Sequence, residues 1–175
     1  MAERGVRAPV KSSMLAAMQV ITLMLVAVAM ATALAHALEF PGKLRLSEAE
    51  YKTVQPIYYP GFTFAGLFGE FGGILATALL LMVTPDAMPF WLVLAALAAL
   101  LLMHALYWLL THPVNNFWLE REKLGAAGAA FFATGAGDTP SDWRSARNRW
   151  EVSHVARAVC ALAGLALIAT ATAVS

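Results

Sequence analysis

The sequence predicts an all-α integral membrane four-helix bundle, in which the third and fourth helices extend beyond the bilayer on one side. Two observations predict this fold class. Of the 175 residues, 60% are hydrophobic and only 13% are charged, whereas soluble domains carry about 25% charged residues. The apolar residues also gather into four stretches of the length, about 20 residues, that a membrane helix needs. We therefore predict a single transmembrane domain over residues 1–175, with spans at about 14–38, 62–83, 90–110 and 154–174.

The first span, residues 14–38, follows Arg4, Arg7 and Lys11 and contains A-L-A at positions 33–35. A basic start, an apolar stretch and an A-x-A sequence also mark a secretory signal peptide. The apolar stretch here is longer than the ~7–15 residues of a signal peptide. We therefore predict that this span is retained as a membrane helix.

The connections between the spans divide the bundle into two ends. The second and third spans are joined by the short, proline-containing segment 84–89, which predicts a tight hairpin. The predicted extramembrane loops 39–61 and 111–153 are long, and both lie at the opposite end, which we call the loop side. Residues 115–124 have a helical composition, and T-P-S-D at 139–142 is typical of a helix start. The last helix is therefore predicted to begin at about Pro140, outside the membrane.

Charge and cysteine content exclude several classes of function. The net charge is +1, so we expect no nucleic-acid partner. Cys160 is the only cysteine, which excludes an intrachain disulfide and cysteine-ligated zinc or iron–sulfur sites. Nine of the twelve lysines and arginines fall on the loop side. The positive-inside rule then predicts a multi-pass protein of the cell (inner) membrane with a cytoplasmic loop side.

Polar residues of the third and fourth helices each gather on one face. At 100° per residue, one face of the last helix carries Trp143, Arg147, Trp150, Glu151, His154 and Arg157, and one face of the third carries His104, Trp108, Thr111, His112 and Asn115. Such a face is unfavourable in lipid, so we expect both to point into the bundle. Trp108 and Trp118 are interpreted as residues of the aromatic belt at the membrane interface.

Depth along the helices places these groups in one half of the membrane. His36 ends the first span and His154 opens the antiparallel last span, so the two should meet at the same level on the loop side. Glu70 is the intramembrane carboxylate of the second span and is surrounded by glycines, which let a neighbouring helix approach closely. All four histidines and Glu70 therefore fall in the loop-side half. Structural roles are the alternative for two of these polar residues. Glu70 is then a protonated acid bonded to another helix, and Arg157 is a partner of Glu151 or a residue whose charged end reaches the interface.

Three chemistries fit this set of residues. The first is a mononuclear or dinuclear metal site with His36, Glu151, His154 and His104 as ligands, because Glu-x-x-His places ligands in di-iron bundles. The second is one b-type haem between His36 and either His104 or His154. The third needs no cofactor: a histidine or carboxylate removes a proton from an acidic C–H, the carbanion reacts with dioxygen, and Arg157 or Asn115 stabilises the oxyanion. Trp150, Arg147 and His112 are expected to bind the flat substrate or cofactor.

A resemblance to a known family comes from the second half of the chain. Pro113-Val114-Asn115-Asn116, followed by Trp143-x-x-x-Arg147-x-x-Trp150-Glu151-x-x-His154-x-x-Arg157, resembles the anthrone oxygenase-like membrane proteins, mostly bacterial and of unknown function. The first half resembles them mainly in hydropathy, and His36, Glu70 and residues 58–62 have no counterpart. The resemblance implies a membrane four-helix bundle and, as in fungal members, oxygenation of an anthrone to an anthraquinone with no established cofactor. The positions that carry over are Asn115, Trp150, His154 and Arg157.

Together these observations predict a membrane-embedded oxidase or oxygenase acting on a hydrophobic aromatic or quinol-like substrate. The predicted catalytic residues are His154, His104, Glu70, Arg157 and Asn115. Expected partners are lipid and a hydrophobic small molecule from the bilayer, within a homo-oligomer or a larger membrane complex. The alternative is a non-catalytic, or haem- or metal-carrying, subunit of such a complex.

Overall fold

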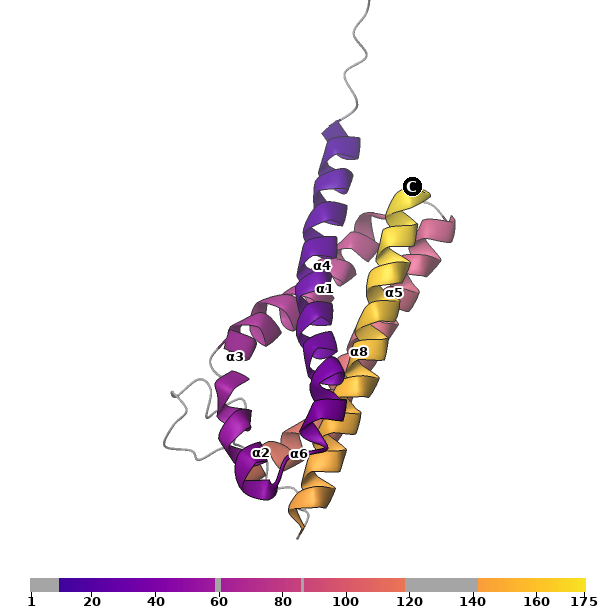
Figure 1. The fold of residues 1–175 in the computed structure, drawn as a ribbon. Coiled ribbons are helices and arrows are strands. Elements are labelled where there is room, and N and C mark those ends of the chain that lie inside the picture. The colour runs from indigo at the N-terminus through magenta and orange to yellow at the C-terminus, as the bar shows by residue number, and fades with distance from the viewer. Residues whose placement is uncertain (1–9, 59–60, 86, 119–141) are drawn as a thin grey trace, which may run out of the picture.

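The computed structural model describes residues 10–58, 61–85, 87–118 and 142–175, and these residues form helices and short connections without any strand. Four helical runs are long and apolar enough to cross a membrane: Ser13–Lys43, Gly61–Val83, Met88–Asn115 and Trp143–Ala173. The predicted all-α four-helix bundle is confirmed, and the chain has the architecture of a multi-pass membrane protein (Figure 1).

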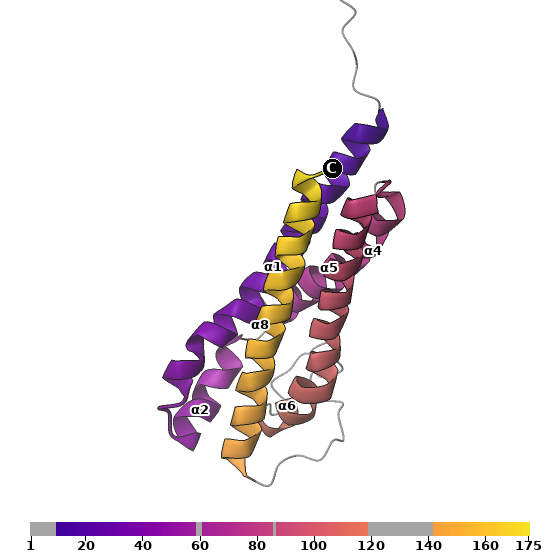
Figure 2. The same cartoon turned by 90° about the vertical axis from the view of Figure 1, so that its right-hand side faces the viewer.

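The two longest helices frame the bundle. Helix α1 (Val10–Lys43) and helix α8 (Trp143–Ala173) pack along each other, and α8 also packs along α5 (Ala87–Leu106). The start of α1 and the C-terminus lie at one end, which we call the terminal side, and the loop side lies at the other (Figures 1 and 2). Helix α1 continues past the predicted end of the first span, residue 38, and therefore carries Glu39 and Lys43 on its last turns.

Residues 39–61, predicted as a loop, contain helical structure of their own. Helix α2 (Glu48–Val54) is followed by a 3₁₀ turn, η1 (Gln55–Tyr58). Ser47 begins α2 with a capping box, in which its backbone N–H donates to Glu50 Oε2 at 2.8 Å and its Oγ accepts from the Glu50 N–H. The sequence Ser47-Glu48-Ala49-Glu50 is the signal that could have predicted this helix. Glu50 is exposed, and its hydrogen bond with Ser47 lowers the pKa of its carboxyl group.

Helix α2 covers the loop-side end of the bundle with aromatic packing. Tyr51 lies edge-on against Trp118, with ring centroids 4.8 Å apart, in a buried cluster that also holds Trp150. Trp118 is only 6% exposed, so its interpretation as a residue of the membrane-interface belt is wrong. Trp118 is buried because helix α2, which begins at residue 48, places the Tyr51 ring against it.

The second span contains a π-helical turn at its glycine-rich start. It runs through α3 (Gly61–Ala65), the π-helix η2 (Gly66–Phe71) and α4 (Gly72–Val83), and crosses α1 obliquely (Figure 1). A Cβ atom on Gly69 would lie 2.8 Å from the Ala29 backbone nitrogen, and one on Gly73 would lie 3.2 Å from Val26 Cγ2. The prediction of close helix approach is confirmed at Gly69 and Gly73, whereas nothing lies within 4 Å of a Cβ atom on Gly66. Helix α5 then begins at Ala87, as the predicted hairpin requires.

The third span contains a second π-helix at the same end. Helix α5 continues as η3 (Tyr107–Thr111) and α6 (His112–Trp118), and α6 turns away from the axis of α5 (Figure 2). Pro113 has no N–H to donate to the Leu109 carbonyl four residues earlier. Arg149 from α8 donates to this carbonyl instead, with Nη2 at 2.7 Å. Pro113 in the sequence predicts that the Leu109 carbonyl lacks its helical donor, whereas only the structure identifies Arg149 as the donor that replaces it.

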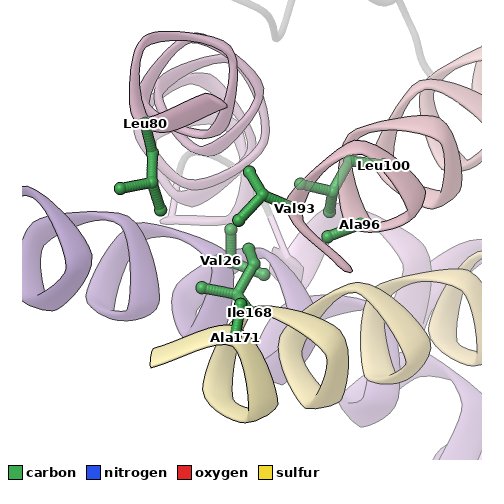
Figure 3. Close-up of a cluster of buried hydrophobic side chains, with 7 residues drawn as sticks. All are labelled: Val26, Leu80, Val93, Ala96, Leu100, Ile168 and Ala171. Carbon is green, nitrogen blue, oxygen red and sulfur yellow. The ribbon is translucent and has the colours of Figure 1, made fainter. Parts of the chain in front are cut away.

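Helix α8 starts slightly later than predicted. Asp142 is its N-cap, with extended backbone angles and a carboxylate that accepts the Ser145 N–H at 3.2 Å. The predicted start at about Pro140 lies outside the described residues. The terminal-side half of the bundle is filled by an aliphatic cluster drawn from all four spans (Figure 3): Val26, Leu80, Val93, Ala96, Leu100, Ile168 and Ala171.

Candidate functional site

A pocket of about 50 Å³ lies between the helices in the loop-side half. Its wall draws on α1, η1, α3, η3, α6 and α8, and consists of Thr32, Ala33, His36, Tyr58, Phe62, Tyr107, Thr111, Asn115, Trp150, His154 and Arg157. The π-helix η3 supplies Tyr107 and Thr111. Because a π-turn adds a residue and rotates the side chains that follow, it often occurs at functional sites.

Two histidines from antiparallel helices meet on the pocket wall. The ring centroids of His36 and His154 lie 4.5 Å apart, which confirms the prediction that they meet at one level. His36 also contacts the rings of Tyr58 and Phe62, at 4.7 and 4.5 Å, and Trp150 lies 3.8 Å from His154. The pocket is therefore lined by imidazole and aromatic rings on one side.

A chain of polar groups that we call the inner network runs from the pocket wall to the space behind it: His154 and Arg157 on the wall, and Glu70 and the half-buried His104 behind them. Arg157 Nη2 donates to Glu70 Oε2 at 2.6 Å, and His104 Nδ1 lies 2.9 Å from Glu70 Oε1. Arg157 Nη1 lies 3.3 Å from His154 Nε2. The suggested pairing of Arg157 with Glu151 is therefore wrong, since its partner is Glu70. This buried ion pair joins η2 to α8.

The partners assign the protons on two of the imidazoles. Trp108 Nε1 can only donate, and it lies 2.9 Å from His104 Nε2, so the proton of His104 is on Nδ1 and is donated to Glu70. His154 Nδ1 lies 2.8 Å from the Trp150 carbonyl oxygen, which can only accept, so Nε2 is its acceptor towards Arg157. Both rings are therefore neutral, with both nitrogens engaged.

A second set of polar groups, the rim network, lies nearer the loop-side surface: Glu39, Lys43, Tyr51, Tyr58 and Glu151. Lys43 Nζ lies 3.1 Å from Glu39 Oε2 and 3.6 Å from Glu151 Oε1. Tyr51 donates to Glu151 Oε1 at 2.7 Å, and Tyr58 donates to Glu39 Oε2. Burial and the adjacent carboxylates raise the pKa of both tyrosines, so both remain protonated donors. The sequence analysis did not single out Lys43, for which the i, i+4 spacing from Glu39 was the available signal.

Two residues of the pocket wall hold buried donors that have no hydrogen-bond partner among the described residues: Asn115, through Nδ2, and Arg157, through Nε. The amide orientation of Asn115 is set by Trp150, whose Nε1 donates to Asn115 Oδ1 at 3.0 Å. His36 Nδ1 is likewise buried without such a partner, and lies 4.0 Å from Glu39 Oε2. Buried polar groups are nearly always hydrogen-bonded in native proteins. The pocket is therefore suited to a ligand that carries an oxygen acceptor.

The structure brings together part of the predicted site. His36, Asn115, Trp150, His154 and Arg157 line the pocket, and His104 and Glu70 stand directly behind it in the inner network. Other predicted residues lie elsewhere. Arg147 bonds Asn148 Oδ1 at 3.1 Å and lies over the Trp143 ring, His112 packs against Trp108, and Glu151 belongs to the rim network.

The predicted metal ligands are not gathered into one group in the described residues. Across the described ranges of the chain, no group of three or more His, Cys, Asp or Glu side chains is placed to hold a metal ion. Both nitrogens of His104 and of His154 are engaged, and Glu151 is paired with Lys43. The rings of His36 and His154 are in contact, which leaves no room for a porphyrin between them.

No protein-family model matches this chain, and neither a curated protein nor a solved structure matches it. The resemblance to anthrone oxygenase-like proteins remains a prediction.

Proposed function

We propose that the protein is a membrane-embedded oxidase or oxygenase that acts on a flat, hydrophobic aromatic or quinol-like molecule from the bilayer, with anthrone-like ketones as the leading class. The observation that carries the proposal is the pair of buried, unpartnered donors of Asn115 and Arg157 on the wall of a pocket lined by aromatic rings. Two N–H donors suit one substrate oxygen, and the aromatic wall suits a flat ring system.

Arg157 and Asn115 would stabilise the negative charge that develops on the substrate oxygen. Glu70 and His154 hold the guanidinium group of Arg157, and Trp150 holds the amide of Asn115. Donors that are fixed before the reaction need not reorganise when charge develops, which is the main source of oxyanion stabilisation.

We assign the role of general base to His36. His154 and His104 were predicted as catalytic, but both nitrogens of each ring are engaged. His36 Nδ1 faces Glu39, which leaves Nε2 to take the substrate proton. His154 would then orient Arg157 and pack against Trp150 rather than transfer protons.

The chemistry balances with dioxygen as the oxidant. For an anthrone-like ketone, His36 takes one proton from the ring CH₂ group, and the enolate carbon bonds dioxygen to give a hydroperoxide after reprotonation. Loss of the second C–H proton and cleavage of the O–O bond release water and leave a new carbonyl. One CH₂ group and one dioxygen thus give one C=O and one water.

The size of the pocket sets a condition on substrate entry. An engineered cavity of about 150 Å³ holds one benzene, whereas this pocket measures about 50 Å³. It accommodates dioxygen or the oxygen-bearing edge of a substrate, and a ring enters only when lining side chains move. We therefore expect substrate binding to change the fluorescence of Trp150, which lies on the wall.

The test uses the full chain in lipid nanodiscs with anthrone and alkylated hydroquinones as probes. Oxygen uptake is followed with an electrode, and incorporation of labelled oxygen from ¹⁸O₂ is followed by mass spectrometry. We expect anthrone to gain one labelled oxygen, and kcat to fall roughly 100-fold in His36→Ala and in Asn115→Ala. Gln19→Ala, on the terminal side, is the control and should retain activity. A folded wild-type protein that turns over none of these probes would contradict the proposal and favour the non-catalytic subunit.

A further inference from the structure

We infer that the proton leaving the pocket passes from His36 to Glu39 and then to water on the loop side, whereas Glu70 is a fixed counter-ion that takes no part in proton transfer. The role of this route in catalysis rests on the proposed function. The route itself is a property of the side chains, so it can be tested without a substrate.

Two carboxylates flank the pocket, and they differ in their access to water. The Glu39 side chain is 42% exposed, whereas the Glu70 side chain is 8% exposed. Both oxygens of Glu70 are engaged, one by Arg157 and the other by His104. A proton placed on Glu70 would break a buried ion pair and leave Arg157 without its partner, which is strongly unfavourable. Glu39 also pairs with Lys43 and accepts from Tyr58, but both contacts are made by Oε2, and Oε1 has no partner among the described residues. Glu70 therefore suits a permanent charge, and Oε1 of Glu39 suits a transient proton.

His36 connects the pocket to Glu39 along one helix. The two residues are three positions apart on α1, with His36 Nδ1 4.0 Å from Glu39 Oε2. Lys43 and Tyr58 hold Oε2, so the route requires a rotation of the Glu39 side chain that turns its other oxygen, Oε1, to hydrogen-bond distance from His36. His36 can then accept a substrate proton on Nε2 and release another from Nδ1 to Glu39. The imidazole is neutral before and after this step, and only its tautomer changes.

The other groups around His36 cannot take the proton. Lys43 is a cation held between Glu39 and Glu151, and Arg157 is a cation paired with Glu70. Tyr51 and Tyr58 are protonated donors to the two rim carboxylates. Both nitrogens of His154 are engaged.

Glu151 is linked to Glu39 through Lys43 but differs from Glu39 in exposure. Its side chain is fully buried between Lys43 and Tyr51. A proton on Glu151 therefore has no direct access to water. Among the groups described around His36, Glu39 is the acceptor that reaches the surface.

The first experiment measures proton exchange in the substrate-free protein. With ¹⁵N-labelled histidine in nanodiscs, the His36 ring N–H signal is assigned by its loss in His36→Gln, and its exchange with water is followed by NMR. We expect Glu39→Gln to slow this exchange roughly tenfold or more. The matched control is Glu48→Gln, which removes one exposed carboxylate from α2 and should leave the exchange unchanged. Unchanged exchange in Glu39→Gln would overturn the route.

The second experiment measures turnover with the probe that the wild type oxidises fastest. We expect Glu39→Gln to lower kcat about tenfold with little change in KM, and small acidic buffers such as formate to restore part of the rate. Slow exchange in Glu39→Gln without any turnover by the wild type would support the route and contradict the proposed oxidation. Wild-type turnover that Glu39→Gln does not impair, together with unchanged exchange, would contradict the route and leave the oxidation standing.

Discussion

The two halves of this bundle are built from the same four helices but are held together by different interactions. The terminal-side half packs aliphatic side chains and small residues, as at Gly164, where a Cβ atom would lie 3.2 Å from Leu100 Cδ2. Among the described residues, the buried charged side chains all lie in the loop-side half: Lys43, Glu70, Glu151 and Arg157. Both π-helices of the described chain also lie in that half.

The comparison shows how a small membrane protein can separate stability from chemistry. Tight packing of apolar side chains stabilises helix association in a bilayer without any polar group. Buried ionisable groups are unfavourable in the same solvent and mark functional sites. We therefore expect substitutions in the terminal-side half to change stability alone, and substitutions in the loop-side half to change stability and function together.

The largest effect is expected from Arg157→Ala, which leaves the Glu70 carboxylate buried without its cation. Loss of one member of a buried ion pair typically costs about 3–5 kcal/mol. Unfolding of the detergent-solubilised protein, followed by circular dichroism, measures the change. The double variant Arg157→Met, Glu70→Gln removes both charges and should recover most of the stability. An Arg157→Ala protein as stable as the wild type would show that the ion pair in η2 and α8 has no structural role.

Leu100→Ala tests the opposite half. Leu100 is 2% exposed in the aliphatic cluster, and removal of a buried leucine side chain costs about 2–5 kcal/mol. The neighbouring Leu101 is 49% exposed, so Leu101→Ala should change stability by no more than about 0.5 kcal/mol. Turnover per folded molecule should be unchanged in both variants. Loss of turnover in folded Leu100→Ala protein would show that the two halves are coupled.

Gly69→Ala tests the contact between η2 and α1, near the boundary of the two halves. The new Cβ atom would lie 2.8 Å from the Ala29 backbone nitrogen, so the helices must separate. Overpacking of this kind costs typically 1–3 kcal/mol, and it should also displace the adjacent Glu70. Gly66→Ala is the matched control, because nothing lies within 4 Å of its added Cβ atom. Equal unfolding midpoints for the two variants would contradict the close approach.

The smallest effect is expected from Arg149→Ala, which removes the donor to the Leu109 carbonyl. A hydrogen bond from a charged group contributes about 1.5–3 kcal/mol, and the half-buried position of Arg149 favours the lower end of this range. Pro113→Ala restores a backbone N–H near the same carbonyl, so Arg149→Ala should cost less in that background than in the wild type. A double-mutant cycle on the unfolding free energy measures the difference. Strict additivity would show that Arg149 does not compensate for Pro113.

Several features of the fold and the site could be predicted from the sequence. A rise of about 1.5 Å per residue fixes how deep each side chain lies, which is why His36 and His154 were correctly placed opposite each other. The glycines around Glu70 and the free carbonyl at Leu109 follow from residue type alone. The sequence Ser47-Glu48-Ala49-Glu50 also predicts a capping box, although residues 39–61 as a whole were predicted to be a loop.

Other features could not be predicted, because they depend on the direction in which side chains point. A π-turn rotates the helix that follows it by about one residue, or about 100°, and nothing in the sequence around Glu70 or His112 fixes where such a turn falls. The observed ion pairs therefore differ from the predicted pairing of Arg157 with Glu151. Arg157 pairs with Glu70, and Glu151 pairs with Lys43. Lys43 and Tyr51 thus engage one oxygen of Glu151, which was predicted as a metal ligand.

The sequence by itself determined that the chain forms four membrane-length helices with their polar groups in one half, because hydropathy and helical rise are properties of single segments. Only the tertiary structure decided which donors meet which acceptors, that Asn115 and Arg157 retain unpartnered nitrogens on a shared wall, and that His36 rather than His104 borders the pocket. These outcomes depend on the rotation of each helix against its neighbours, which is fixed by packing between segments far apart in the chain.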